Sequence, residues 1–259
     1  MRAAELAWFR LGFPRDVTVS QVLAVLTSLS GAPHGSRMVF DLEASAGGIV
    51  HRLAITPGHE GILLAALRAG IPSLRADRID APTKHTPVRL LWQLDSPRAV
   101  LRSDEPAATS TSLLSSLFPL ERGEAVRLRW TMRPHPQPPR QGANTQRAES
   151  DRALNAKAKL PTVKAFGALS VDAGTGARVR GLVQRVSASL WSLRTPNGRL
   201  VADPPMWGQA GYRLGRRGRH LNVAELAAVI GWPVEEPDLP GLELGAAKRV
   251  VPSGALARD

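Results

Sequence analysis

The sequence predicts an α+β protein made of two ferredoxin-like sandwiches in tandem, followed by a small region of helix and turns. Three observations predict this. Residues 8–79 follow the order strand, helix, strand, strand, helix, strand, and residues 89–202 repeat that order with longer connections. The phosphate-binding pattern GxxxxGK[ST] is absent from the chain. A twinned α/β scaffold without a catalytic motif is expected to bind or position a partner.

The first unit is expected to cover residues 1–80, with two helices on one face of an antiparallel sheet. A capping box, Thr18-x-x-Gln21, and Gly31 mark the ends of its first helix. The second helix is expected to point Ile62, Leu63, Ala66 and Leu67 inward. The pattern predicts strands at residues 8–13, 38–45, 49–56 and 73–79, and helices at residues 17–30 and 57–70.

The second unit is expected to cover residues 88–202. Valines and leucines from Val179 to Leu193 recur at helical spacing and predict a long amphipathic helix. Residues 133–161 contain the run PHPQPPRQ and no apolar periodicity, so they predict a disordered, proline-rich insertion. The other expected elements are strands at residues 89–95, 125–132, 162–171 and 199–202, and a short helix at residues 110–118.

The third region, residues 203–259, reads as a basic turn, a short helix and a tail. Asn222 and Glu225 form a capping box for a helix that ends near Ile230. The tail has many turn residues and one weak strand candidate around Leu242. We expect this region to lead toward a segment that is absent from the 259 residues.

Composition excludes several classes of protein. The chain has 43% hydrophobic and 22% charged residues, which suits a packed core with a solvated surface. It has no cysteine, which removes disulfides, thiolate metal sites and cysteine nucleophiles. The longest apolar stretch, residues 62–67, is too short for a membrane helix, and no apolar signal core precedes it. A cytoplasmic location without an integral membrane segment is therefore expected.

One glycine pattern resembles a dinucleotide-binding fingerprint. Gly174 and Gly176 lie between a predicted strand and helix, with Gly181 further on. The third glycine is two residues late, the preceding strand alternates, and no acidic residue ends a following strand. A turn with a glycine-assisted helix start explains the pattern better, and no cofactor is expected.

Other polar and aromatic residues favour structural roles. Asp41 and Glu43 share one face of a strand, where solvation is the simplest explanation. Tryptophans 92, 130 and 191 lie in predicted elements and are expected in the core. The histidines have no ligand spacing, so no metal site is expected and surface or loop positions are favoured: His34, His51, His59, His85, His135 and His220.

The strongest candidate site is a group of cations. Four arginines separated by glycines precede His220: Arg213, Arg216, Arg217 and Arg219. Such arginines on a turn can bind a phosphate backbone, and Arg127, Arg129 and Arg133 on one strand face could extend the surface. A solvated basic turn is the alternative. The net charge of +12 fits a polyanionic partner, but it also fits an arginine-rich genome bias.

Four segments of the chain carry a resemblance to a known family. They are FRLGFPRDVT, MVFDLEASAGGIVHRLAIT, LLAALRAGIPSLR and, above all, LNVAELAAVIGWPVEEPDLPGLELGAAKRVVPS. The chain, from about Leu6 to Pro252, resembles the region that precedes the motor domain in actinobacterial type IV secretory system conjugative DNA transfer ATPases. The likeness is strongest from Leu221 to Pro252. The family's nucleotide-binding residues would lie beyond this region, so none is carried over.

The resemblance implies a non-catalytic accessory or assembly region. Such a region would dock on a motor ring or on neighbouring secretion components, in the cytoplasm or at the inner face of the cell membrane, and would be oligomeric only within a larger ring. The alternative is a freestanding basic module that binds DNA through the arginines named above. An enzyme of another type is the least supported reading.

Overall fold

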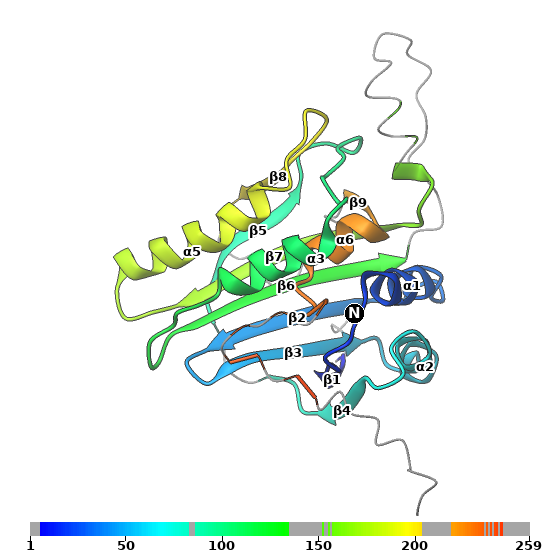
Figure 1. The fold of residues 1–259 in the computed structure, drawn as a ribbon, viewed down its shortest axis with the longest axis horizontal. Helices are drawn as coiled ribbons and strands as arrows, with labels where there is room; N and C mark the ends of the chain where they lie inside the picture. Colours follow the sequence, from blue (N-terminus) through cyan, green and yellow to red (C-terminus); the bar gives the residue numbers. More distant parts are fainter. Residues whose placement is uncertain are drawn as a thin grey trace, which may run out of the picture.

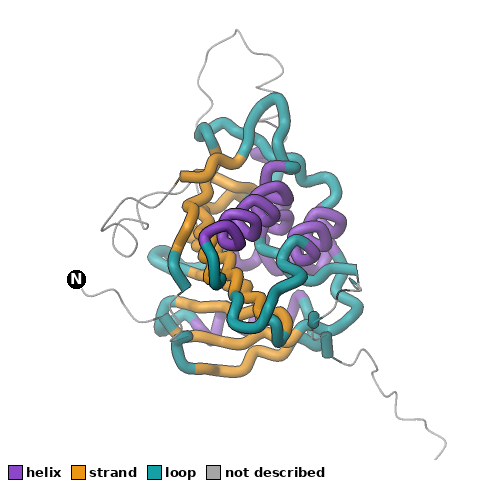
Figure 2. Tube along the Cα trace, turned by 90° about the vertical axis from the view of Figure 1, so that its left-hand side faces the viewer, coloured by secondary structure: helices purple, strands orange, loops and turns teal. Residues whose placement is uncertain are grey.

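The computed structural model describes residues 6–82, 86–134, 157–203 and 219–235, and the single residues 152, 155, 237, 239, 241, 242, 244 and 245. Within these residues the chain forms one large antiparallel sheet with a layer of helices (Figure 1). The expected α+β class is therefore confirmed. In the upper part of Figure 2, the helices lie to the right of the strands.

The described strands form one nine-stranded sheet in the order β4-β1-β3-β2-β6-β7-β5-β8, and β9 pairs with β7. Every pairing between named strands is antiparallel. The strands are β1 Ala7–Gly12, β2 Met38–Ser45, β3 Gly48–Ile55, β4 Arg75–Ile79, β5 Val88–Leu94, β6 Ala125–Pro134, β7 Thr162–Asp172, β8 Leu200–Asp203 and β9 Arg219–Asn222.

The two halves of the sheet repeat one strand order. Counted within its own half, each sheet reads fourth, first, third, second: β4-β1-β3-β2 and β8-β5-β7-β6. The second strand of each half lies at its inner edge, and these edges pair from Met38 opposite Met132 to Ser45 opposite Ala125. We call this β2–β6 pairing the seam. Because the edges pair, the two sheets that the sequence treats separately are continuous.

The helices contact one another along a single layer. They are α1 Val19–Ser30, α2 Glu60–Gly70, α3 Pro106–Ser115, α5 Gly176–Trp191 and α6 Val223–Val229. Helix α1 contacts α2 and α6, and α3 contacts α5 and α6. The short helix α6 thus lies between the helices of the two halves (Figure 1). The expected capping boxes at Thr18 and Asn222 are both present.

The burial of some side chains agrees with the prediction, and the burial of others does not. Trp92 and Trp130 are fully buried, as expected. Trp191 is 46% exposed; it is the last residue of α5, and its ring meets the Trp92 ring in an edge-on arrangement with centroids 5.8 Å apart. Ile62 is 62% exposed, so the expectation that it points inward is wrong. The buried stripe of α2 is Leu63 and Leu67, one helical turn apart, and Ile62 lies about 100° off it.

Residues 219–234 are part of the fold and do not form a separate extension. Strand β9 adds to β7, and every residue from Leu221 to Val234 is buried. Near Leu242, where a strand was expected, the described residues form isolated bridges, from Leu242 to Ile49 and from Gly245 to Pro14. The backbone N–H of Ile49 also donates to the Gly241 carbonyl at 2.8 Å. Among the described residues, no helix is both long and apolar enough to cross a bilayer.

Candidate functional site

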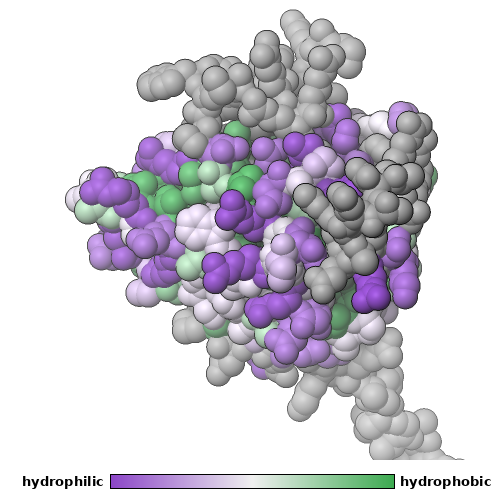
Figure 3. All heavy atoms as spheres, turned by 90° about the horizontal axis from the view of Figure 1, so that it is seen from above, coloured by the Kyte–Doolittle hydropathy of each residue, from purple (hydrophilic) through white to green (hydrophobic). Residues whose placement is uncertain are grey.

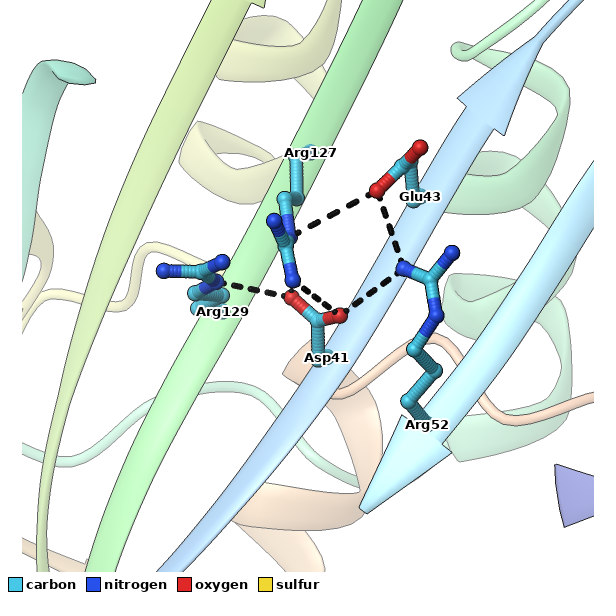
Figure 4. A network of polar contacts seen from close by, with 5 residues as sticks. All are labelled: Asp41, Glu43, Arg52, Arg127 and Arg129. Carbon is cyan, nitrogen blue, oxygen red and sulfur yellow. Dashed lines mark hydrogen bonds and ion pairs between the residues drawn. The ribbon is translucent and has the colours of Figure 1, made fainter. Parts of the chain in front are cut away.

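The most prominent polar site of the described chain lies at the seam. Two acidic and three basic side chains meet there on the face of the sheet that points away from the helices, which we call the open face (Figure 4). Strand register places them together, because Asp41 lies opposite Arg52 on β3 and Arg129 on β6, while Glu43 lies opposite Arg127. We call these five residues the seam network: Asp41, Glu43, Arg52, Arg127 and Arg129.

Asp41 is the centre of the seam network. Arg127 donates to both carboxylate oxygens, from Nε to Oδ1 at 2.5 Å and from Nη2 to Oδ2 at 2.8 Å. Arg129 Nε donates to Oδ1 at 2.8 Å, and Arg52 Nη1 donates to Oδ2 at 3.1 Å. This bidentate and shared geometry is the strong form of a charged hydrogen bond. It links β3, β2 and β6 across the seam.

The electrostatics keep Asp41 ionised. Burial alone would raise the pKa of its carboxyl group, but the hydrogen bond and charge of Arg127, together with Arg129, outweigh burial and lower the pKa below its ordinary value. The Asp41 side chain is 0% exposed. An ionised carboxylate that accepts four hydrogen bonds serves as a structural anchor, and no proton is available from it near neutral pH.

Glu43 and Trp8 extend the seam network. Arg52 Nη1 also donates to Glu43 Oε2 at 2.9 Å, so one guanidinium contacts both acids. The guanidinium carbons of Arg127 and Arg129 each lie 5.9 Å from the centre of the Trp8 ring, within the range of a cation–π contact. The arginines at the seam are therefore bound by carboxylates and by an aromatic face.

This geometry corrects two expectations. Asp41 is buried, so the reading of Asp41 and Glu43 as a merely wet strand face is wrong for Asp41. Arg127 is 1% exposed, so it does not lie on an outward surface as expected. The physical reason is the same for Asp41 and Arg127. The acidic side chains of β2 and the basic side chains of β6 pair across the seam, and these pairs bury both residues. Arg129 stays partly exposed while bound to Asp41.

Of the four arginines predicted before His220, only Arg219 belongs to the described residues. Arg219 begins β9 and lies opposite Ala165 on β7, at the edge of the sheet rather than at the seam. Arg213, Arg216 and Arg217 lie outside the described residues. The structure thus brings Arg127 and Arg129 together and does not bring Arg219 to them.

A buried histidine lies on the helix side of the same sheet. His51 Nε2 is 2.8 Å from the Gly231 carbonyl oxygen, and its ring meets the Phe13 ring edge-on. Burial lowers the pKa of His51 to about 4, although the Gly231 bond and the charge of Asp41 act to raise it. The expectation of a surface or loop position is therefore wrong for His51, which fastens the loop after α6 to β3.

A buried ion pair fixes α6 itself. Lys157 Nζ lies 2.9 Å from Glu225 Oε2 and donates to the Ala99 carbonyl at 2.6 Å. The Glu225 carboxylate also accepts hydrogen bonds from the backbone N–H groups of Leu101 and Asn222, each at 2.8 Å. Lys157 belongs to the segment predicted to be disordered. That prediction is wrong at this residue, while residues 135–151 lie outside the described part.

Sequence reasoning missed these buried charges for an identifiable reason. Asp41 and Glu43 share the two-residue spacing of Arg127 and Arg129, and such complementary spacing on two strands is the signal that could have paired them. The signal needs knowledge that β2 and β6 are neighbours. The Lys157–Glu225 pair has no such pattern, since its members come from unrelated segments.

Two other kinds of site considered from the sequence are a metal site and a dinucleotide-binding turn at Gly174 and Gly176. No group of three His, Asp or Glu side chains suited to a metal ion occurs within the described ranges. Gly176 is the first residue of α5 and Thr175 caps it, as a turn with a helix start predicts. Strands β7 and β8, which flank α5 in sequence, are not adjacent in the sheet, so a dinucleotide-binding βαβ unit is not formed there.

No family model and no curated protein matches the chain.

Proposed function

We propose that this protein is a non-catalytic assembly module of the kind that precedes the motor domain in type IV secretion and conjugative DNA transfer ATPases. The observation that carries the proposal is the position of α6. The segment with the strongest likeness to that family contains α6, which lies between the helices of both halves and is buried throughout. A segment that joins two halves into one body suits a rigid docking platform.

The buried charges support the same proposal. Asp41, Glu225 and Glu124 each bind basic partners within the fold, the last through Arg178 at 2.7 and 2.8 Å. Acidic groups committed to such pairs hold elements together and are poorly placed to transfer protons to a substrate. The proposal places the protein in the cytoplasm or at the inner face of the cell membrane, without a cofactor.

We also propose that each half is a ferredoxin-like unit. Support comes from the order fourth, first, third, second in both half-sheets, and from helices that follow the first and third strand of each half. Joining two such units edge to edge through their second strands gives a broad platform. Figure 3 shows that the surface seen from above carries small groups of hydrophobic side chains between hydrophilic ones.

The DNA-binding alternative has less support at the residues first chosen for it. Arg127 and Arg129 bind Asp41, and their charge is compensated there. A phosphate backbone would have to compete with a buried carboxylate for the same guanidinium groups. For this reason the docking proposal is preferred, and Arg213, Arg216, Arg217 and Arg219 remain the arginines of the alternative.

Mixing the purified protein with the motor domain of a type IV secretion ATPase from the same genome tests the proposal. Light scattering during size-exclusion chromatography should detect a complex that persists when the salt concentration is raised, since docking through packed surfaces is weakly screened. Ile62→Asp and Trp191→Asp place a charge on an exposed apolar position of the first and second half. Loss of the complex in one variant would identify the half that docks.

Two results would overturn the proposal. One is a wild-type mixture that never forms a complex at any salt concentration. The other is ATP hydrolysis by the purified 259-residue protein, with contaminants excluded. Translating the DNA that follows the codon for Asp259 is a further check, because a GxxxxGK[ST] pattern close by would connect the chain directly to a motor.

A further inference from the structure

A second group of basic side chains lies on the open face, at the end of the seam away from the β2–β3 turn. Arg37 directly precedes β2, Arg133 is close to the end of β6, and Lys164 is close to the start of β7. Arg133 lies opposite Lys164 in register, and the charge of Arg133 acts on Arg37. We call these three residues the cationic row: Arg37, Arg133 and Lys164.

The cationic row shares its face with the seam network. Arg133 lies four residues after Arg129 along β6, an even number of positions, so its side chain emerges on the same side of the sheet as Arg127 and Arg129. Arg37 stands in the same relation to Asp41 along β2. Directly opposite side chains in an antiparallel pair have Cβ atoms roughly 5 Å apart. Arg133 and Lys164 therefore bring two positive charges close together.

No acidic partner compensates these charges among the residues that the structure describes. Every ion pair of the described open face that involves Asp41 or Glu43 goes to Arg52, Arg127 or Arg129, and none reaches the cationic row. Like charges placed opposite one another on a sheet are destabilising. An arrangement that costs stability without an internal partner points to an external one.

Arg37 gives an independent indication of an external ligand. Its Nε is buried and has no hydrogen-bond partner in the described part of the molecule. Burial first, and then the charge of Arg133, lower the pKa of Arg37. A buried guanidinium nitrogen without an acceptor is unusual in a native fold, and an oxyanion beside the row would supply that acceptor and offset the repulsion.

From this geometry we infer that Arg37, Arg133 and Lys164 form a binding site for the phosphate groups of a nucleic-acid backbone. This inference does not rest on the docking proposal, because it uses a different face of the molecule. A polyanion fits better than one phosphate ion, since the row crosses three neighbouring strands, β2, β6 and β7. The net charge of +12 adds long-range attraction to any polyanion.

A membrane surface is the less favoured polyanion. Proteins that bind anionic membranes usually add apolar side chains that enter the headgroup region. The large hydrophobic side chains that are exposed in the described chain are Ile62, Leu160 and Trp191, and none belongs to the cationic row. A row of cations without an exposed apolar residue in it fits a sequence-independent backbone contact.

Two double variants with equal charge change test the inference. Arg133→Gln with Lys164→Gln removes two cations of the row, and Arg10→Gln with Arg75→Gln removes two exposed cations from β1 and β4, on the same face. Each double variant lowers the net charge from +12 to +10, by the loss of two positive charges. Fluorescence anisotropy with a labelled DNA duplex of about 20 base pairs, titrated at several salt concentrations, measures binding. Circular dichroism and thermal melting confirm that each variant is folded.

The expected result is specific to the row. At about 100 mM salt, the row variant should bind the duplex at least about tenfold more weakly than wild type, and its slope of log K against log salt should be shallower by about 2. The β1 and β4 variant should stay within about threefold of wild type, as expected for charges away from the contact. This pattern would support the inference.

Three results would overturn it. The first is equal weakening by both double variants, which would mean attraction by net charge alone. The second is wild-type protein that fails to bind the duplex even at about 50 mM salt. The third comes from parallel titrations with inorganic phosphate and with vesicles containing anionic lipid. If the row variant lost binding to either of these but kept duplex binding, the ligand would be a free phosphate or a headgroup.

Discussion

Two groups of basic side chains share the open face of the sheet, and within the described part of the chain only one of them forms ion pairs with acidic side chains. In the seam network, Asp41 and Glu43 bind Arg52, Arg127 and Arg129 directly. In the cationic row, Arg133 lies opposite Lys164 and its charge acts on Arg37. Arg129 and Arg133 belong to the same strand and the same face, yet their surroundings are opposite.

The difference teaches how to read basic residues on a strand. A cation whose register partner is a carboxylate is part of the framework, and its removal leaves a buried charge without a partner. A cation whose register partner is another cation weakens the framework, and its presence needs an external explanation. Spacing along one strand does not separate these cases, because both groups alternate in the same way. The neighbouring strand separates them.

The variant expected to change stability most is Asp41→Ala, in the seam network. Removal of this carboxylate leaves the buried Arg127 guanidinium without its partner, and we expect the free energy of unfolding to fall by about 4 kcal/mol. Urea denaturation followed by circular dichroism measures the change. Asp95→Ala is the matched control, because Asp95 and Arg199 form an exposed pair at 3.7 Å, and its loss should cost less than about 1 kcal/mol. Equal effects of the two variants would contradict a structural role for the seam network.

The second test uses the pH dependence of His51, which lies on the opposite side of the sheet from Asp41. Its pKa is about 4 in the folded protein, against an ordinary value of 6.5. The unfolded chain therefore binds the proton more readily, so this contribution to stability is complete above pH 6.5 and is lost as the pH falls toward 4. The expected loss over that window is about 3 kcal/mol.

His51→Gln removes this titration while it keeps a side chain that can donate to the Gly231 carbonyl. Urea denaturation at several pH values from about 7 down to 4 should show a steeper loss for wild type than for the variant, by about 3 kcal/mol in total. Carboxylates titrate in both proteins, so their contributions cancel in the difference. Parallel curves for wild type and His51→Gln would show that His51 is protonated in both states alike.

Gly231→Ala asks whether the loop after α6 matters as much as the charges at the seam. Gly231 has φ of +67°, and an added Cβ would lie 2.7 Å from Leu42 Cδ2. Backbone strain and overpacking together should lower the free energy of unfolding by about 2 kcal/mol. Gly61→Ala is the control, since it lies in α2 and an added Cβ there meets open space. Thermal melting should separate the two, and equal melting temperatures would mean that the loop tolerates rearrangement.

The smallest effects compare the two arginines of β6 directly. Arg129→Gln removes a charged hydrogen bond to Asp41 from a partly exposed side chain, so a loss of about 1 kcal/mol is expected. Arg133→Gln relieves repulsion with its neighbours and should raise stability by a few tenths of a kcal/mol, up to about 1. Urea denaturation in low salt measures the change in the free energy of unfolding for each of the two variants. Changes of the same sign would remove the distinction between the seam network and the cationic row.

Much of the fold follows from local patterns in the sequence. The strand at residues 38–45 is found as predicted, and α1, α5 and α6 begin where Thr18, Thr175 and Asn222 cap them. These features depend on alternation and on hydrogen bonds between residues a few positions apart. Helix α3 was predicted about four residues late, because Pro106 at its start is a weaker signal than its later leucines.

The candidate site could not be predicted in the same way. Asp41 and Arg127 are far apart in sequence, and nothing local shows that β2 and β6 pair along their full length. Lys157 lies in a segment with no periodic pattern, so its burial beside Glu225 had no local signal. The exposed Trp191 and the buried His51 reverse residue-type preferences for the same reason, since burial depends on which element packs on top.

The sequence by itself determined the α+β class, the repeated element order, most helix ends and the strongly basic character of the chain, because composition and short-range periodicity are properties of neighbouring residues. Only the tertiary structure decided that the two halves share one sheet, that α6 lies between them, and which arginines have a carboxylate opposite. Those features depend on contacts between distant segments, and a strand edge pairs with whichever edge the folded chain brings beside it.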